Sequence, residues 1–196
     1  MALHRFPSQT SDQQDKVVKA VFFDRDGVLN ELVDRGDGVK TAPWNTSEFK
    51  ILPNAKEAVD IVKKLGYKSY VVTNQPDMYD GHMSKESLDL MMKMIQNWLN
   101  IDSYFCAFDR SSKLYKPNSG MIEYFINLYG ISRKKSFMIG DRWKDIVCGY
   151  NSKLTTIFIG TEYSCPEEYK YIKPDHVVNN VLEACELIKE LEKNDN

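Results

Sequence analysis

Two carboxylates follow the first apolar segment of the sequence, in the stretch AVFFDRDGVLN (residues 20–30). Asp24 and Asp26 flank Arg25, and Gly27 comes directly after them. In an extended chain, residues two positions apart face the same side. One acid could therefore attack an electrophile while the other donates and accepts a proton. A solvated turn at the end of a strand would have the same composition, so the rest of the chain has to distinguish the two.

Polar side chains stand at three more boundaries of apolar segments. Thr73 and Asn74 end the segment that begins with YKSYVV, and Lys116 precedes the helical pattern SGMIEYFINLYG. Asp141 and Asp145 follow KSFMIG. Each has an ordinary explanation by itself, as a turn, a surface charge or a helix N-cap. Their order, with each group at a terminus that can face one edge of a sheet, favours a shared site.

A phosphoryl group is the ligand that fits this set of side chains. Its negative charge needs Mg²⁺, a lysine and hydroxyl or amide donors. Magnesium prefers oxygen ligands, typically a couple of carboxylates with waters and phosphate. Asp24 and Asp141 could supply the carboxylates, together with the backbone carbonyl of Asp26. The residues therefore indicate chemistry through an aspartyl-phosphate, with Arg25 expected to point the opposite way into structural contacts.

Apolar segments rich in β-branched and aromatic residues alternate with helical patterns. We expect strands at 16–23, 67–73, 103–108, 135–140 and 154–159, and a short sixth at 176–178. Strands that alternate with helices form a parallel sheet covered on both faces. The predicted fold is α/β, a Rossmann-like doubly wound parallel sheet, in which ligands bind beyond the carboxyl ends of the strands.

Four segments have helical periodicity, at 53–66, 84–99, 119–130 and 180–193. In the first of them, Asn54 is expected to cap the N-terminus, with Glu57 three residues later. Gly66 is expected to end it, because glycine readily adopts the left-handed conformation that follows a helix.

The composition is that of a globular protein. The chain has 196 residues, 42% of them hydrophobic and 28% charged, enough to bury a core in one domain. A formal net charge of -2 provides no basic surface for nucleic acid or membranes. Residues 1–16 lack the apolar core of a signal peptide and are expected to form a disordered or flexible tail before one domain over 17–192. We expect a cytoplasmic monomer or small homo-oligomer that acts on a small molecule, without nucleic-acid or membrane partners.

Four segments resemble, in order, the motifs of the haloacid-dehalogenase-like (HAD-like) phosphatases: FFDRDGVLN, VVTNQ, KPNSGM and GDRWKDI. They are most similar to the subgroup of histidinol-phosphate phosphatase and D-glycero-D-manno-heptose 1,7-bisphosphate phosphatase. The resemblance implies Asp24 as nucleophile and Asp26 as general acid/base. It implies phosphoryl binding by Thr73 and Lys116, beside which Asn74 is a further candidate. It also implies Mg²⁺ ligation by Asp24, Asp26 and Asp141, with Asp145 supporting the metal site.

The segment before Lys116 departs from that subgroup. Many members carry a zinc-holding loop, C-x-H followed by C-x-C, whereas FCAFDRSSKLYKP keeps only Cys106. One thiol cannot complete a tetrahedral site, so no structural zinc is predicted. The four cysteines of the chain are scattered without a C-x-x-C pair, which favours reduced thiols. Tyr115 replaces the arginine that, in relatives, helps to bind the substrate.

The loops near the expected site are too short for a large cap domain. The stretch from Asn30 to Asn54 is expected to be a single loop, and the span from Asn74 to Lys116 to hold one helix and one strand. An open site would then take its specificity from the loops at 31–49 and 76–85. Arg35 and Arg142 are the specificity candidates, and the further loop residues Lys40, Trp44 and His82 are equally explained as ordinary surface or packing residues.

The function expected from these residues is a Mg²⁺-dependent phosphomonoesterase that hydrolyses a small phosphorylated metabolite, with a sugar phosphate or bisphosphate as the leading class. A polynucleotide 3′-phosphatase stays open as an alternative, because LYKPNSGM also resembles the corresponding stretch of those enzymes. A receiver-like signalling domain or a non-catalytic binding domain on the same scaffold is the alternative of another class. Asp26 supplies the additional acid that hydrolysis needs, which favours the enzyme.

Overall fold

A parallel sheet forms the centre of the computed structural model, which describes residues 17–36 and 38–194. Its six strands lie in the order β5 (Ser103–Ala107), β4 (Lys68–Asn74), β1 (Ala20–Phe23), β6 (Phe137–Gly140), β7 (Thr155–Ile159) and β8 (His176–Val178). All six predicted strands are present, and every pair of neighbours is parallel. The tail expected over residues 1–16 lies outside the described residues.

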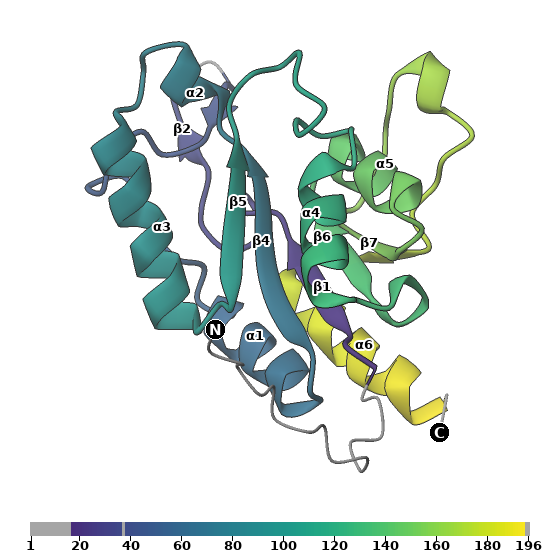
Figure 1. Cartoon of the computed structure of the whole chain (residues 1–196). Coiled ribbons are helices and arrows are strands. Elements are labelled where there is room, and N and C mark those ends of the chain that lie inside the picture. Colours follow the sequence, from purple (N-terminus) through teal and green to yellow (C-terminus); the bar gives the residue numbers. More distant parts are fainter. Residues whose placement is uncertain (1–16, 37, 195–196) are drawn as a thin grey trace, which may run out of the picture.

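Helices cover both faces of this sheet (Figure 1). One face packs against α1 (Ala55–Lys64), α3 (Lys85–Leu99) and α6 (Val181–Asn194), and the other against α4 (Gly120–Tyr129) and α5 (Trp143–Asn151). The central strand β1 is buried at every residue, because alternate side chains point into the two layers. Val21 and Phe23 pack with the first group of helices, and Ala20 and Phe22 pack with the second. The doubly wound architecture predicted from the sequence is confirmed.

The ends of α1 follow the sequence only in part. Gly66 has a φ of 86° just beyond the C-cap, as expected for a glycine that ends a helix. Asn54 occupies the N-cap position, but its side chain makes no capping hydrogen bond. Its backbone is helical, with a φ of -92° and a ψ of -1°, whereas a capping side chain needs an extended backbone. The predicted capping role of Asn54 is therefore wrong.

Small elements occupy the segments that were expected to be plain loops. A two-stranded antiparallel hairpin, β2 (Val33–Asp34) and β3 (Lys40–Thr41), lies between β1 and α1, and the one-turn helix α2 (Pro76–Tyr79) follows β4. The expectation of a single loop after Asn30 is therefore wrong, because the hairpin is held by side chains far apart in that segment. In the described part of the chain these small elements take the place of a large cap. Two 3₁₀ helices, η1 (Arg133–Lys135) and η2 (Glu167–Tyr169), lie in later connections.

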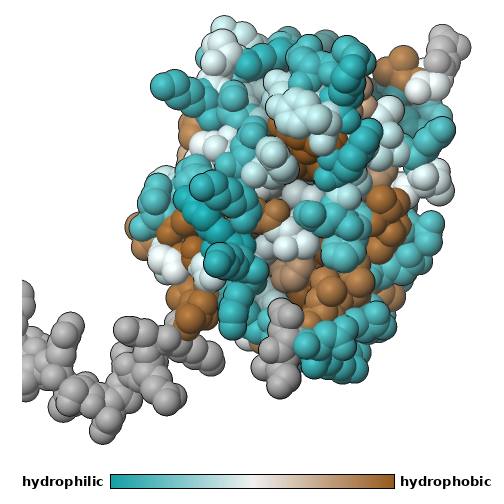
Figure 2. All heavy atoms as spheres, turned by 90° about the vertical axis from the view of Figure 1, so that its right-hand side faces the viewer, coloured by the Kyte–Doolittle hydropathy of each residue, from teal (hydrophilic) through white to brown (hydrophobic). Residues whose placement is uncertain are grey.

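The surface of the molecule is mixed. Hydrophilic side chains cover most of the face on the right of Figure 1, with separate hydrophobic patches between them (Figure 2). None of the helices within residues 17–36 and 38–194 is long and apolar enough to cross a membrane.

Candidate active site

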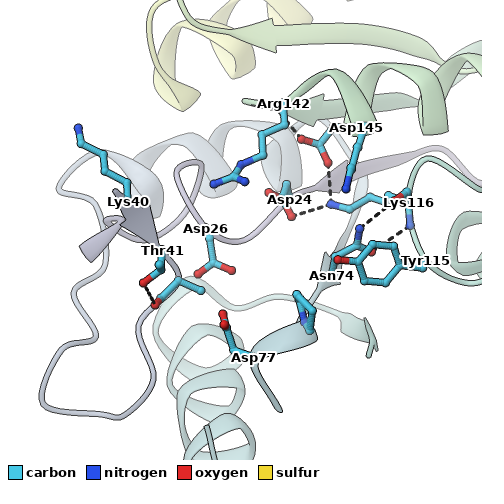
Figure 3. A pocket seen from close by; sticks show the side chains of 13 residues that line it. Asp24, Asp26, Lys40, Thr41, Asn74, Asp77, Tyr115, Lys116, Arg142 and Asp145 are labelled. Carbon is cyan, nitrogen blue, oxygen red and sulfur yellow. Dashed lines mark hydrogen bonds and ion pairs between the residues drawn. The ribbon is translucent and has the colours of Figure 1, made fainter. Parts of the chain in front are cut away.

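A pocket of about 220 Å³ opens beyond the carboxyl ends of the central strands (Figure 3). It lies where the strand order changes direction at β1, which has β4 on one side and β6 on the other. Both signs of charge meet in it. The carboxylates that line it are Asp24, Asp26, Asp77 and Asp145, and the cations are Lys40, Lys116, Arg142 and Lys144.

Lys116 is the buried cation at the centre of the pocket. Its Nζ lies 2.6 Å from Asp24 Oδ1 and 2.6 Å from Asp145 Oδ1, and it donates to the carbonyl of Val72 at 2.8 Å. The side-chain amide of Asn74 donates to the Lys116 carbonyl and accepts from the Lys116 N–H. Asn74 thus holds the lysine backbone in place, and it also lines the pocket.

Burial and like charge perturb the acids of this pocket. Burial raises the pKa of Asp24 to about 6, and the neighbouring carboxylates of Asp145 and Asp26 add to the rise while Lys116 opposes it. Burial, with the charges of Asp24 and Asp145, raises the pKa of Asp141 to about 8. Burial alone would lower the pKa of Lys116, but its contacts with Asp145 and Asp24 outweigh that effect and raise it. Lys116 alone thus does not offset the charge of Asp24, Asp141 and Asp145.

Three carboxylates are arranged as a metal site would need them. Single oxygens of Asp24, Asp141 and Asp145 all lie within 4.8 Å of one another. Asp141 Oδ1 is buried and has no hydrogen-bond partner within the described residues. An unpartnered carboxylate oxygen beside two other acids fits a hard divalent cation such as Mg²⁺. The carboxylate of Asp26 lies outside this group of three.

Two glycines allow the acids to approach the strand ends. Gly27 has a φ of 87°, and a Cβ at this position would lie 2.3 Å from Asp141 Oδ2. A Cβ at Gly140, the last residue of β6, would lie 2.1 Å from Asp145 Cβ. Any larger residue would push these acids away. Gly27 was visible in the sequence only as the residue after the acid doublet, because its contact with Asp141 depends on the fold.

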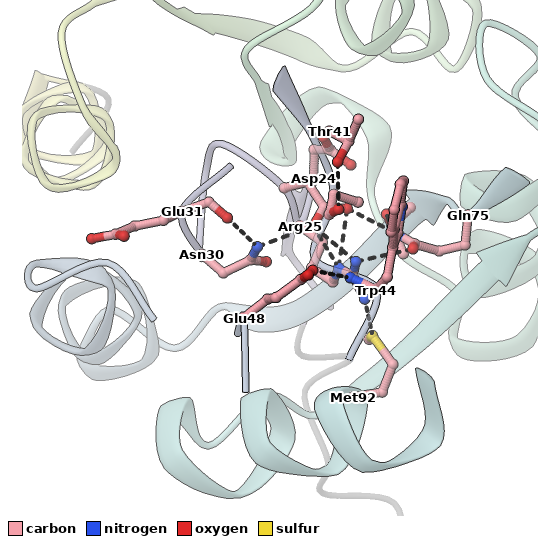
Figure 4. Close-up of polar contacts among 12 residues, drawn as sticks. Asp24, Arg25, Asn30, Glu31, Thr41, Trp44, Glu48, Gln75 and Met92 are labelled. Carbon is pink, nitrogen blue, oxygen red and sulfur yellow. Dashed lines mark hydrogen bonds and ion pairs between the residues drawn. The ribbon is translucent and has the colours of Figure 1, made fainter. Parts of the chain in front are cut away.

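A buried polar network around Arg25 (Figure 4) also holds the carboxylate of Asp26. Arg25, which is completely buried, donates from Nε and Nη2 to Asp26 Oδ1 at 3.0 and 2.8 Å. Asn30 Nδ2 donates to the same oxygen at 3.0 Å. Arg25 makes structural contacts, as expected, but its guanidinium reaches the Asp26 carboxylate instead of pointing away from it. The network leaves Asp26 on the pocket wall, 8% exposed.

Gln75 completes that network and was not singled out from the sequence, although it is the last residue of VVTNQ. Its Nε2 donates to Asp26 Oδ2 at 2.7 Å and to Thr73 Oγ1 at 2.8 Å, and its Oε1 accepts from Arg25 Nη2 at 2.9 Å. Thr73 is 1% exposed and does not line the pocket. Its hydroxyl therefore lies behind the pocket wall in this structure.

The specificity candidates separate into two groups. Arg35 donates to Thr41 Oγ1 and to both carboxylate oxygens of Glu48, and its guanidinium lies 3.7 Å from the centre of the Trp44 ring. His82 stacks on the same ring at 4.8 Å. These contacts use the donors of Arg35 to close the hairpin and keep it off the pocket wall, so its selection as a specificity residue is not supported by its position.

Arg142 and Lys40, by contrast, line the pocket. The Arg142 guanidinium points from the start of α5 toward Asp24 (Figure 3). Lys144 and Asp77 line it as well and were missed, since in the sequence they are ordinary charged residues of short helical segments.

Known proteins are similar to this chain in sequence and in fold. A family model described as HAD-hydrolase-like matches residues 114–184. A Chlorobaculum tepidum protein named D-glycero-D-manno-heptose-1,7-bisphosphate 7-phosphatase is 29% identical over 189 residues, covering 85% of this chain and 92% of that protein. A Helicobacter pylori protein named D-glycero-beta-D-manno-heptose-1,7-bisphosphate 7-phosphatase is 30% identical over 145 residues, covering 69% and 80%. This chain belongs to the HAD-like phosphatases.

A solved HAD-like phosphatase has the same fold. The structure of D,D-heptose 1,7-bisphosphate phosphatase from B. bronchiseptica, complexed with magnesium and phosphate, superposes with a TM-score of 0.72 at 18% identity, covering 89% of this chain and 99% of that one. At that identity the likeness extends to the fold. The family membership expected from the four motifs is confirmed, and with it the class of enzyme, a phosphatase.

Proposed function

We propose that this HAD-like phosphatase is a Mg²⁺-dependent phosphomonoesterase that hydrolyses a sugar phosphate or sugar bisphosphate through an aspartyl-phosphate on Asp24. The observation that carries the proposal is the meeting of Asp24, Asp145 and Lys116 in one pocket, with Asp141 beside the two acids in the three-carboxylate group. The names of the relatives, heptose bisphosphate phosphatases that match most of this chain, support a phosphorylated sugar as the substrate class.

Asp24 would form the covalent bond. It follows the buried central strand, and its N–H donates to the Ile139 carbonyl at 2.9 Å, which fixes its backbone against β6. In the first step a carboxylate oxygen of Asp24 forms a bond to phosphorus while the bond to the sugar oxygen breaks. Lys116, 2.6 Å from Asp24 Oδ1, stabilises the negative charge of the transferred group.

Asp26 would move the protons. It gives a proton to the leaving sugar oxygen, then takes one from the water that attacks the aspartyl-phosphate, which releases phosphate and restores Asp24. Both Asp26 oxygens accept hydrogen bonds from Arg25, Asn30 or Gln75 in this structure. Proton transfer therefore requires one oxygen to exchange a protein donor for the substrate oxygen, while the remaining donors keep the carboxyl group in place.

The carboxylates of Asp24, Asp141 and Asp145, with the Asp26 backbone carbonyl, would hold the metal. Bound Mg²⁺ supplies positive charge that neutralises these acids and the phosphoryl oxygens. For zinc we infer no site of its own around Cys106. One thiol cannot complete a tetrahedral zinc site, and Phe108, Ser112 and Leu114 follow Cys106 in this segment.

Inorganic phosphate release tests this function. Sugar phosphates, sugar bisphosphates, histidinol phosphate, nucleotides and a 3′-phosphorylated oligonucleotide would be assayed with Mg²⁺ and with EDTA. Asp24→Asn should abolish release, while Asp89→Asn, on the exposed side of α3, is the matched control and should behave as wild type. Turnover that survives in Asp24→Asn would contradict the mechanism, and hydrolysis of the oligonucleotide alone would replace the substrate class.

A further inference from the structure

Lys144 is a pocket cation to which no role has yet been assigned. It is the second residue of α5, and its side chain is half-buried on the pocket wall. Its Nζ lies 5.5 Å from the centre of the Tyr115 ring and 5.6 Å from that of Trp143. Among residues 17–36 and 38–194 it has no ion pair or hydrogen bond with an acid. The ammonium is therefore held by aromatic faces while its charge stays available.

The acids of the pocket are already engaged elsewhere. Lys116 pairs with Asp24 and Asp145, and Arg25 pairs with Asp26. The remaining pocket acid, Asp77, comes from α2, across the pocket from the start of α5 (Figure 3). The α5 side thus presents the ammonium of Lys144, which makes no ion pair within residues 17–36 and 38–194, although Asp145 of the same helix acts on it from a distance.

Arg142 adds a second cation to that side, and the two charges belong to the same wall of the pocket. Placing like charges close together is unfavourable unless an anion lies near them. A ligand with a negative group on this side would relieve the repulsion and gain charge-assisted hydrogen bonds.

We propose that Lys144 determines specificity by binding a negatively charged substituent on the non-reacting part of the substrate. The inference rests on the proposed phosphatase function of this pocket. A carboxylate and a second phosphate share the required chemistry. The ring of Tyr115, the residue directly before Lys116, supports this cation. The positive charge of the subsite comes from helix α5.

The test compares substrates that differ by one charge. For one sugar, kcat/KM is measured for the monophosphate, for the bisphosphate and for the phosphorylated sugar acid, in wild type, Lys144→Met and Lys144→Arg. Methionine keeps an unbranched side chain for packing on the rings and removes the charge. Lys134→Met, an exposed lysine of η1 outside the pocket, is the matched control.

The readout is the ratio of kcat/KM for the doubly charged substrate to that for the monophosphate. Lys144→Met should lower this ratio about tenfold, equivalent to about 1.4 kcal/mol, through a higher KM. Lys144→Arg should restore most of it, and Lys134→Met should keep it within about twofold of wild type. The substrate whose ratio falls more identifies the anion as phosphate or carboxylate.

An unchanged ratio for both anionic substrates in Lys144→Met, or an equal loss on all three substrates, would overturn the assignment of Lys144 and leave the phosphatase function standing. Failure of that function has a different signature, since wild type would then hydrolyse none of the substrates or Asp24→Asn would retain activity. In that event the subsite proposal fails with it.

Discussion

Replacing Gly27 with alanine tests how closely the acid doublet and the metal site depend on each other. The backbone there has a φ of 87°, a conformation that costs a residue with a side chain about 1–3 kcal/mol. Gly66→Ala provides the matched control, because Gly66 has a φ of 86° and an added Cβ there would meet nothing within 4 Å. Both variants should therefore lose a similar amount of stability from backbone strain.

The two variants should differ in activity. An alanine Cβ at position 27 would lie 2.3 Å from Asp141 Oδ2, so this carboxylate must retreat by about 1 Å to reach ordinary contact. A displacement of that size in a catalytic group costs on the order of 100-fold in rate. We expect kcat/KM to fall about 100-fold in Gly27→Ala, with more Mg²⁺ needed for half-maximal activity, and to stay within about twofold of wild type in Gly66→Ala.

Thermal unfolding and phosphate release would be measured on the same preparations. At this chain length each kcal/mol lowers Tm by about 2–4 °C, so both variants should still be folded at 25 °C. A folded Gly27→Ala that keeps the activity and Mg²⁺ dependence of Gly66→Ala would refute the reasoning, since Asp141 would then have no need of its observed position.

Three more outcomes are expected. Lys116→Met leaves the buried carboxylates of Asp24 and Asp145 without their shared cation, so it should abolish turnover. It should also lower the free energy of unfolding, measured in urea at pH 8, by about 3–5 kcal/mol. Unchanged stability would contradict a buried ion pair at Lys116. Because folding raises the pKa of Asp141 from 3.8 to about 8, the folded protein holds a proton that the unfolded chain has released, so stability in EDTA should fall by up to about 1.4 kcal/mol per pH unit between pH 5 and 8. The urea midpoint of wild type should therefore fall as the pH rises, and that of Asp141→Asn should fall less. A midpoint that rises with pH in both proteins would contradict the raised pKa of Asp141. Gln75→Leu removes the amide that donates to Asp26 Oδ2 and should lower kcat about tenfold with little change in KM, measured by phosphate release beside wild type. An effect on KM alone would place Gln75 in substrate binding.

Some of the candidate site follows from local sequence. A residue at the end of a strand or directly after it lies at the carboxyl edge of the sheet wherever that strand is placed, so Asp24, Asn74 and Asp141 share an edge once the strands are parallel. The positions of the main strands and helices could also be predicted, since they depend on the periodicity of neighbouring residues. The hairpin β2–β3 could not be predicted, because it is held by Arg35, whose partner Glu48 lies 13 residues away.

The direction of each side chain was decided by the tertiary structure. Asn74 meets the Lys116 backbone across 42 residues of chain, and Arg25 turns to Asp26 and Gln75 because a buried guanidinium must find acceptors where the packed chain offers them. No pattern of neighbouring residues indicates that these distant groups come into contact. The sequence by itself determined that Asp24, Asp26, Asp141, Asp145 and Lys116 lie at this edge of the sheet, whereas Asp77 and Lys144 were missed. Only the packed fold decided which of them face the pocket, which support others, and that Lys144 brings a cation beside Tyr115.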